Sequence, residues 1–579
     1  SGVGAKADPA EAIDWFRKAA AQGNAAARSN LGTAYREGVG VEKNATEALN
    51  LYKAAADDYH TDAYHNLGLL YLAGDGVERD YAEAAAWFRK AVDRGSTDAA
   101  CRLAYLHHEG LGAAKNLKTA AYLYRKAAER GNAEAAHALG CLFSAGEGVR
   151  RDFAEASKWY AKAAKLGHVP ARHDLGVFYQ TLSKDRDRQK EAARWHREAA
   201  AGGDADSRFE LGSLYATGNG VKRDLPKAVR WLRKAANQGH VGAGRLLSAF
   251  YGEGLGVKRS AEKAAFWCRK TAERGDPASL FELADRYARG KGVMRDPEKA
   301  AVWFQKAADS GDAEAMCRLA KIHLRGLGVE KDEMKAIALF AEAAGLGNPE
   351  ALTVLGKLYR VGSRVEQNME KAAECFGKAA AKDFAPAQHE YAMCLMSGEG
   401  VRENLAEAVY WLQNAAARDS APAQNSLAAL YLVGRGVEPD FDRAADLWQR
   451  AAKRGHAEAR LELGACYLRG TGVPENPRKA AFWFREAAGQ GLAKAKHALG
   501  ALYSKGLGVK RDLPKAAGLF REAAEQGDPD ARFSLGRAYE KGLGVDRDLK
   551  LAMEWYAKAA ASGNEEARKI LKKRREENE

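Results

Sequence analysis

A single 36-residue period governs almost the whole chain of 579 residues and constrains its fold more than any other feature. When a repeat is numbered from Asp8, the same residue types return sixteen times without insertion or deletion, and the last repeat begins at Asp548. Position 5 of the repeat is Ala in all sixteen copies, position 24 is Leu in fifteen, and ten of the eleven Trp lie at position 8. The length therefore counts stacked copies of one unit. We expect one solenoid instead of the roughly four globular domains that such a length would otherwise suggest.

Each unit reads as two helices. Asp or Asn at position 1 is a typical N-cap, and Gly at position 16 is a typical end of the first helix. Within residues 83–91, apolar side chains at positions 5, 8, 9 and 12 fall on one face at helical spacing. The second helix carries a small residue, Leu, another small residue and Tyr, and a Gly-x-Gly turn such as residues 110–112 closes the unit. The pattern predicts an all-α fold.

The pattern resembles the Sel1-like repeat family, which is related to the tetratricopeptide repeats. The likeness is carried by runs such as DLPKAVRWLRKAA at 224–236 and LGALY at 499–503, and it covers nearly the whole chain. The resemblance implies a right-handed α-α superhelical solenoid of sixteen 36-residue helix pairs. It also implies a concave groove lined by the first helix of each unit, used as an adaptor or scaffold for other proteins. One cysteine-rich branch staples each repeat with a disulfide, and this chain lacks that repeated Cys pair.

The chain divides into three parts on this reading. Gly2 and Gly4 fall where a preceding unit would have its Gly-x-Gly turn, so we interpret residues 1–7 as the remnant of a further repeat and the chain as a fragment of a longer array. Residues 8–571 hold the sixteen repeats. In residues 572–579, Lys572 and Arg575 replace the small residue and Tyr, which is typical of a polar capping helix or tail. We expect a bacterial protein of the cytoplasm or periplasm, and the sequence does not decide between them.

One face of the first helix is left free by this pattern. At about 100° per residue, positions 3, 7, 10, 11 and 14 lie opposite the apolar arc. Positions 10 and 11 are repeatedly Arg-Lys, and we predict that this stripe binds a partner, the alternative being an ordinary solvated helix face. The basic residues of the predicted stripe are Arg89, Lys90, Arg125, Lys126, Arg194, Arg197, Arg230, Arg233, Lys234, Arg269 and Lys270.

Four aromatic residues interrupt position 7, which should be polar: Tyr122, Phe266, Tyr410 and Phe482. Such rings are candidate anchors for a bound peptide. They could equally rest on the neighbouring Trp or Phe, and the sequence leaves the two alternatives open.

The positive charge is concentrated in one segment. The chain carries +14 overall, residues 101–300 hold 37 basic against 23 acidic residues, and residues 1–100 have a net charge of −4. This segment favours an acidic protein or peptide as partner. Nucleic acid is disfavoured because no RNA- or DNA-binding motif accompanies the charge. Within the segment, residues 180–190 lack both turn glycines, which predicts either a longer second helix or a charged, mobile turn.

Catalysis is not expected. Each of the thirteen His occupies a position of the structural repeat, and no phosphate-binding loop, zinc-protease motif or nucleophile elbow occurs. The nearest approach to a metal cluster is His107-His108-Glu109, but adjacent helical residues do not face one another. We therefore expect no enzyme activity, no cofactor and no metal. Cys375 and Cys394 could face each other within one unit, as two thiols or as a disulfide.

Together these observations predict a non-catalytic scaffold that binds a protein or extended peptide in its groove, with residues 101–300 as the basic segment. Two alternatives are a structural spacer or self-assembling array, and a binder of polyanions or envelope polysaccharides. No apolar run is long enough to span a membrane.

Overall fold

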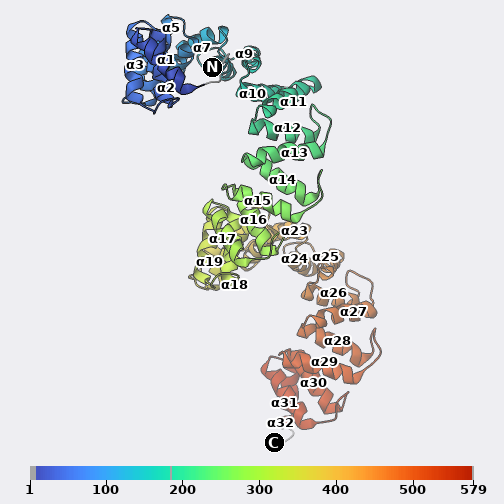
Figure 1. The fold of residues 1–579 in the computed structure, drawn as a ribbon. Coiled ribbons are helices and arrows are strands. Elements are labelled where there is room, and N and C mark those ends of the chain that lie inside the picture. The colour runs from blue at the N-terminus through green and yellow to red at the C-terminus, as the bar shows by residue number, and fades with distance from the viewer. Residues whose placement is uncertain (1–7, 183–184, 577–579) are drawn as a thin grey trace. The chain divides into compact units, whose positions relative to one another are not determined.

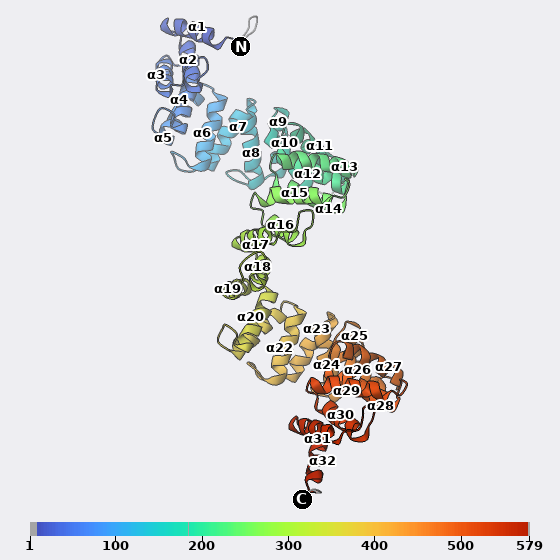
Figure 2. The same ribbon diagram turned by 60° about the horizontal axis from the view of Figure 1, so that its bottom comes forward.

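The computed structural model describes residues 8–182 and 185–576, and every regular element among them is an α-helix. The chain forms two compact units, unit 1 (Ser1–Arg295) and unit 2 (Asp296–Glu579). In each unit, helices follow one another in chain order through short connections (Figures 1 and 2). No helix in the described ranges is both long and apolar enough to cross a membrane. The predicted remnant at residues 1–7 lies outside the described residues, as do residues 183–184 and 577–579.

The helices of unit 1 are α1 (Pro9–Ala21), α2 (Ala25–Glu37), α3 (Ala45–Asp57), α4 (Thr61–Ala73), α5 (Tyr81–Asp93), α6 (Thr97–Glu109), α7 (Leu117–Glu129), α8 (Ala133–Ala145), α9 (Phe153–Lys165), α10 (Val169–Leu182), α11 (Arg186–Ala201), α12 (Ala205–Thr217), α13 (Leu225–Asn237), α14 (Val241–Glu253), α15 (Ala261–Ala272) and α16 (Pro277–Arg289).

The helices of unit 2 are α17 (Pro297–Asp309), α18 (Ala313–Arg325), α19 (Glu333–Gly345), α20 (Pro349–Val361), α21 (Met369–Ala380), α22 (Ala385–Ser397), α23 (Leu405–Ala417), α24 (Ala421–Val433), α25 (Phe441–Lys453), α26 (Ala457–Arg469), α27 (Pro477–Gly489), α28 (Ala493–Lys505), α29 (Leu513–Glu525), α30 (Pro529–Lys541), α31 (Leu549–Ala561) and α32 (Glu565–Glu576). The sixteen predicted helix pairs are confirmed.

Side-chain caps begin the odd-numbered helices where the repeat predicts them. Asp80, for example, accepts hydrogen bonds from the backbone N–H groups of Ala82 (2.8 Å) and Glu83 (3.0 Å). The exception is α11, because position 1 there is Arg188, which has no acceptor to offer. Asp185 caps this helix instead, and α11 starts three residues early. The segment without turn glycines thus lengthens the helices on both sides of residues 183–184.

The Gly-x-Gly turn demands glycine for two separate reasons. Gly110 ends α6 with a φ of 77°, and Gly112 follows with a φ of 71°, a region that disfavours side chains. A Cβ added to Gly112 would also lie 2.3 Å from the carbonyl carbon of Tyr81. In one repeat of unit 2, Arg364 takes the place of the second glycine of the turn, and its φ is 64°.

The core lies between each even-numbered helix and the odd-numbered helix that follows it. Position 9 of the odd helix places an aromatic ring over the small residue at position 25, so that a Cβ added to Gly68 on α4 would lie 2.6 Å from the ring of Phe88 on α5. The position-8 Trp, predicted to share this apolar face, lies nearer the edge of the core. Trp195 and Trp267 are buried, whereas Trp15 is 61% exposed. Positions 8 and 9 point about 100° apart, and only position 9 faces the preceding helix squarely.

Hydrogen bonds between loops tie several repeats to the one before them. The side chains of Arg94, Arg130 and Arg274, all at position 15, donate to the backbone carbonyl oxygen 35 residues earlier at 3.2, 3.1 and 2.9 Å. Gln238 and Gln490 make the same bond in other repeats. In these five repeats the bond satisfies a backbone carbonyl just after an odd-numbered helix and helps to hold neighbouring repeats in register.

Helices two apart in the chain approach one another most closely when both are even-numbered, as in α2–α4, α4–α6, α20–α22 and α28–α30. Closer spacing is the geometry expected of the inner layer of a curved stack. All seven Cys are free thiols, so Cys375 and Cys394 form no disulfide.

Candidate binding surface

A row of arginines on the odd-numbered helices is held in place by tyrosines of the even-numbered ones. Arg233 on α13 donates to the hydroxyl of Tyr251 on α14 at 2.6 Å, and Arg269 on α15 donates to Tyr287 on α16 at 3.1 Å. Both tyrosine side chains are buried, whereas both arginines are exposed. One donor of each guanidinium is used, and its remaining N–H groups can meet a carboxylate. We call the position-10 arginines and position-28 tyrosines the Arg–Tyr row.

Lysines of the following repeat approach the same tyrosines from the other side. The Lys263 ammonium lies 5.6 Å from the ring centre of Tyr251, and Lys227 lies 5.7 Å from that of Tyr215. A cation over an aromatic face is worth about 0.5–1 kcal/mol at an exposed site. Tyr251 therefore gathers two cations, Arg233 and Lys263, from two successive repeats.

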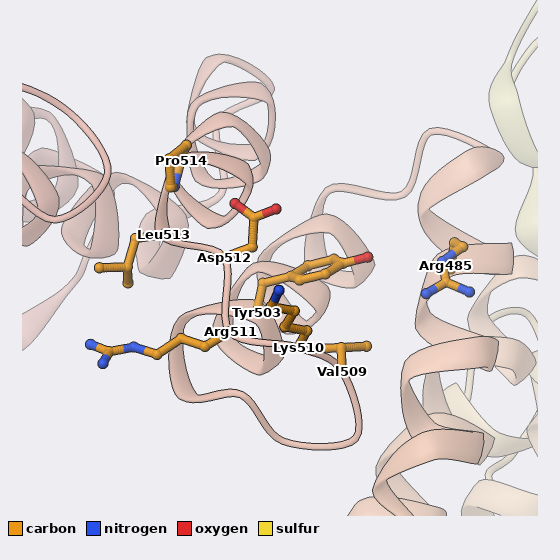
Figure 3. Close-up of a pocket in the computed structure, with 8 residues that line it drawn as sticks. All are labelled: Arg485, Tyr503, Val509, Lys510, Arg511, Asp512, Leu513 and Pro514. Atoms are coloured by element: carbon orange, nitrogen blue, oxygen red, sulfur yellow. The ribbon is translucent and has the colours of Figure 1, made fainter.

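Unit 2 shows this arrangement as an open cavity of about 760 Å³. Figure 3 shows Tyr503 and Lys510 among the residues that line the cavity, with Arg485 on another helix, while Arg511 extends away. The Lys515 ammonium lies 4.5 Å from the ring centre of Tyr503. Hydrogen bonding from Lys515 and then from Arg485 holds the pKa of the Tyr503 phenol below its usual value. Two cations, Lys515 and Arg485, therefore meet at Tyr503.

The lysines at position 11 form a second row, which we call the Lys–Trp row. Lys90 lies 3.8 Å from the ring centre of Trp87, and Lys234 lies 4.4 Å from that of Trp231. Lys270 instead lies 5.9 Å from the ring of Phe266. Within the pair Arg233 and Lys234, the arginine turns toward the even-numbered helix and the lysine toward the Trp of its own helix.

Three of the four aromatic residues at position 7 rest on the neighbouring Trp, which is one of the two alternatives that the sequence left open. Phe266, Tyr410 and Phe482 each contact the next residue, a Trp, edge-on, with ring centres 5.2, 5.1 and 5.0 Å apart. They nevertheless remain 50, 57 and 49% exposed. Tyr122, which is followed by Leu123, is 64% exposed. Three of the rings are steadied by the neighbouring Trp, and all four present a face to solvent.

The remaining predicted residues all lie in unit 1. The Arg125 guanidinium lies 5.7 Å from the ring of Phe143, which replaces the usual tyrosine. Arg194 pairs with Glu198 at 3.3 Å and Glu191 at 3.8 Å, so its charge is largely neutralised within its own helix. The others are exposed, or half-buried in the case of Lys126: Arg89, Lys126, Arg197 and Arg230. Tyr410 and Phe482 belong to unit 2.

One cluster of chemically active side chains escaped the sequence analysis. His137, Cys141 and Asp174, on α8 and α10, bring one potential metal-ligand atom each to within 4.8 Å of one another. The spacing of His137 and Cys141, four residues apart on a helix, was a usable signal. Asp174 joins them only through the stacking of repeats, which spacing along the chain does not reveal.

The predicted nearest approach to a metal cluster, at His107-His108-Glu109, has a different arrangement. The Nε2 atom of His108 lies 3.4 Å from a carboxylate oxygen of Glu147, and burial lowers the pKa of His107. The group of potential metal ligands found in the described residues does not include these three side chains.

The geometry defines a class of protein: an all-helical solenoid of 36-residue helix pairs, with repeated polar and aromatic rows on its surface and a core made only of packing positions. The sequence model of the Sel1 repeat matches sixteen successive segments, from residues 1–24 and 25–60 to 529–564. The chain belongs to the Sel1 repeat family, whose members are generally non-catalytic scaffolds for protein–protein interaction.

Solved structures include similar solenoids from bacteria. A protective antigen of uropathogenic Escherichia coli that displays an SLR fold is 30% identical, with 84% of this chain and 97% of that chain covered and a TM-score of 0.62. A Sel1 repeat protein from Oxalobacter formigenes is 30% identical over 53% of this chain and 90% of that chain, with a TM-score of 0.42. No curated protein matches the sequence.

The family match corrects the phase in which the repeat was numbered. The segments that match the family model begin at residues 25, 61 and 97. The first helix of each family repeat is therefore even-numbered and carries the Leu-Gly-x-x-Tyr pattern. The expectation that the first helix lines the inner surface therefore applies to α2, α4 and their equivalents. It agrees with the closer spacing of those helices. The Arg–Tyr row joins the two layers instead of lining the inner one.

Proposed function

We propose that this chain is a non-catalytic scaffold that holds an acidic segment of a partner protein along the Arg–Tyr row of unit 1. The observation that carries the proposal is the hydrogen bond from Arg233 to Tyr251, repeated by Arg269 and Tyr287. An arginine side chain loses about 2 kcal/mol of rotamer freedom when it is fully immobilised, and these arginines are already partly ordered. Binding a carboxylate to these arginines therefore costs less side-chain entropy than binding it to freely rotating arginines.

The charge of unit 1 supports the same assignment. Unit 1 holds 47 basic and 36 acidic residues, a net charge of +11, whereas unit 2 holds 44 and 41, a net charge of +3. Position 10 is basic in seven of the eight repeats of unit 1 and in two of the eight of unit 2. Long-range attraction toward unit 1 would raise the association rate of an acidic partner, and salt would reduce it.

Aromatic side chains beside the row provide contacts that salt does not screen. Tyr122 and Phe266 in unit 1 are at least half-exposed and lie on the same helices as Arg125 and Arg269. A partner with acidic residues flanking one or two apolar ones would use both kinds of contact. Binding that persists in about 0.5 M salt would therefore report the aromatic contribution, since exposed charges are screened beyond roughly 10 Å at 0.1 M.

The test compares two double variants of the full chain. Arg233→Glu with Arg269→Glu changes the row in unit 1, and Arg485→Glu with Arg521→Glu changes equivalent positions in unit 2, where Arg521 donates to Tyr539 at 2.9 Å. The probe is a fluorescent, extended Glu-rich peptide with a central Leu, followed by fluorescence anisotropy. We expect the unit 1 variant to weaken binding at least tenfold and the unit 2 variant to change it less than threefold.

Equal effects of both variants, or no effect of either, would contradict the proposal. Circular dichroism of each variant checks that the helices persist. A single-stranded oligonucleotide and an anionic polysaccharide of the same charge serve as competitors. If either binds more tightly than the peptide, the chain is a polyanion binder. If no probe binds and the native host yields no co-purifying protein, the spacer alternative stands.

A further inference from the structure

Three side chains of unlike chemistry converge between α8 and α10 in unit 1. The Nε2 atom of His137 lies 2.6 Å from an oxygen of Asp174 and 3.8 Å from the sulfur of Cys141. All three ligand atoms lie within 4.8 Å of one another, and none of the side chains is fully buried. Both helices are even-numbered, so the cluster is on the more closely spaced layer of the stack.

We propose that His137, Cys141 and Asp174 bind a divalent transition-metal ion, with zinc as the best fit, in a three-ligand site with one position left for an outside group. An imidazole, a thiolate and a carboxylate together suit zinc, whereas calcium and magnesium take oxygen ligands only. Three protein ligands leave the fourth tetrahedral position open to water or to a side chain of a partner.

The separations are close to those of a tetrahedral site. With Zn–S of about 2.3 Å and Zn–N of about 2.0 Å, tetrahedral geometry places the two ligand atoms about 3.5 Å apart. The sulfur and Nε2 are already 3.8 Å apart. For metal binding, the carboxylate oxygen of Asp174 would have to move from 2.6 Å to about 3.3 Å from Nε2, and to about 3.5 Å from the sulfur, from which it lies within 4.8 Å.

Other repeats show that the stack does not need this cluster. His389 and His497 occupy the same repeat position as His137, and their Nε2 atoms meet the hydroxyls of Ser426 and Ser534 at 3.1 and 3.0 Å. A serine is therefore sufficient for the inter-repeat bond at this position. The residue four positions after the histidine is Met393 in one case and Ala501 in the other. Only at His137, among the described residues, do a carboxylate and a thiol both join the imidazole.

The surroundings hold the thiol in place. The hydroxyl of Tyr160 on α9 donates to the sulfur of Cys141 at 3.5 Å. Such outer hydrogen bonds orient metal ligands and tune their basicity. The ring of His168 lies 4.7 Å from that of His137, and its Nδ1 accepts a hydrogen bond from the backbone of Ala171 at 3.1 Å. A second imidazole therefore lies at the border of the site.

Cobalt titration of the chelator-treated full chain tests the proposal. Co²⁺ bound by a thiolate gives a ligand-to-metal charge-transfer band in the near ultraviolet together with visible bands of four-coordinate cobalt. We expect saturation at one equivalent and displacement by zinc. Cys141→Ser should remove the charge-transfer band. Asp174→Ser, which recreates the serine arrangement of the other repeats, should weaken cobalt affinity at least tenfold.

His389→Ala is the matched control, because it removes a histidine at the same repeat position and should leave cobalt binding unchanged. Thermal unfolding followed by circular dichroism checks that each variant folds. Three results would overturn the site: no charge-transfer band in the wild-type chain, a band that survives Cys141→Ser, or an Asp174→Ser variant that binds cobalt as tightly as the wild type.

Discussion

Units 1 and 2 each contain sixteen helices built on the same repeat, yet they differ at the positions that packing leaves free. Position 5 is Ala throughout both, and in each unit glycine beneath an aromatic ring sets the distance between paired helices, as at Gly68 and Gly464. Position 10, in contrast, is basic in seven of eight repeats of unit 1 and in two of eight of unit 2. The tyrosine that accepts the arginine persists in both. The comparison shows that the tyrosine at position 28 is common to both units, whereas the arginine at position 10 is what differs between them.

The first prediction tests the glycine-to-aromatic helix packing that both units share, and it has the largest expected effect. Val in place of Gly68 in unit 1 or of Gly464 in unit 2 should lower the free energy of unfolding of the surrounding repeats by about 3 kcal/mol, because overpacking forces helices apart. In both places an added Cβ would lie 2.6 Å from a Phe ring. Hydrogen exchange measured repeat by repeat reports the local stability. Costs that differ by more than about 1 kcal/mol between the units would show that their packing is not equivalent.

The second prediction concerns the acid sensitivity that a histidine at position 9 gives to unit 1. His196 takes the place of the usual aromatic residue at position 9 and is fully buried, with its Nε2 facing Gln180 at 3.2 Å and its Nδ1 unpaired. Burial, and then the nearby charge of His173, lower its pKa to about 4, while Asp204 acts in the opposite direction. Position 9 of unit 2 contains no histidine.

Because the pKa of His196 is lower in the folded state than in the unfolded state, its contribution to stability is complete above about pH 6.5 and is lost as the pH falls toward 4. The loss should be about 2 kcal/mol between pH 7 and pH 5. His196→Phe, which matches Phe88 and Phe484, should abolish it. Urea unfolding of the repeats around α11, followed by hydrogen exchange at both pH values, measures the difference. An unchanged pH dependence in the variant would assign the acid sensitivity to another group.

The third prediction introduces the position-10 arginines that are typical of unit 1 into unit 2. Gln413 on α23 already donates to the hydroxyl of Tyr431 at 3.3 Å, and Gln449 is the equivalent residue one repeat later. Arginine at both positions should extend the Arg–Tyr row into unit 2 and raise its affinity for the Glu-rich peptide by about threefold to tenfold, the gain expected from one or two charge-assisted hydrogen bonds. Lysine at the same two positions is the control for charge alone and should give a smaller gain, because it cannot bind a carboxylate through two parallel bonds. No gain with arginine would mean that the row requires other features of unit 1.

Much of the local structure could be predicted from single residues. Asp80 as a cap and Gly110 as a helix end follow from local chemistry that acts within a few positions, and both are confirmed. The shift of α11 to an earlier cap follows from Arg188 at the capping position, although the sequence alone did not choose between a longer helix and a mobile turn. Helical spacing places the position-8 Trp on the apolar face, but it gives only the width of that face and not which edge of it meets the next helix.

By itself, the sequence determined the all-helical class, the 36-residue period, the helix boundaries and the family, because identical short-range signals recur sixteen times and reinforce one another. Only the tertiary structure decided where the free side chains point and what they meet. Arg233 and Lys234 are neighbours in the chain, yet one turns to a tyrosine of the next helix and the other to a Trp of its own. The convergence of His137 and Cys141 with Asp174 likewise depends on how one repeat stacks on the next. Stacking brings together residues more than 30 positions apart in the sequence. Spacing rules for a single helix relate only residues a few positions apart, so they cannot predict such contacts.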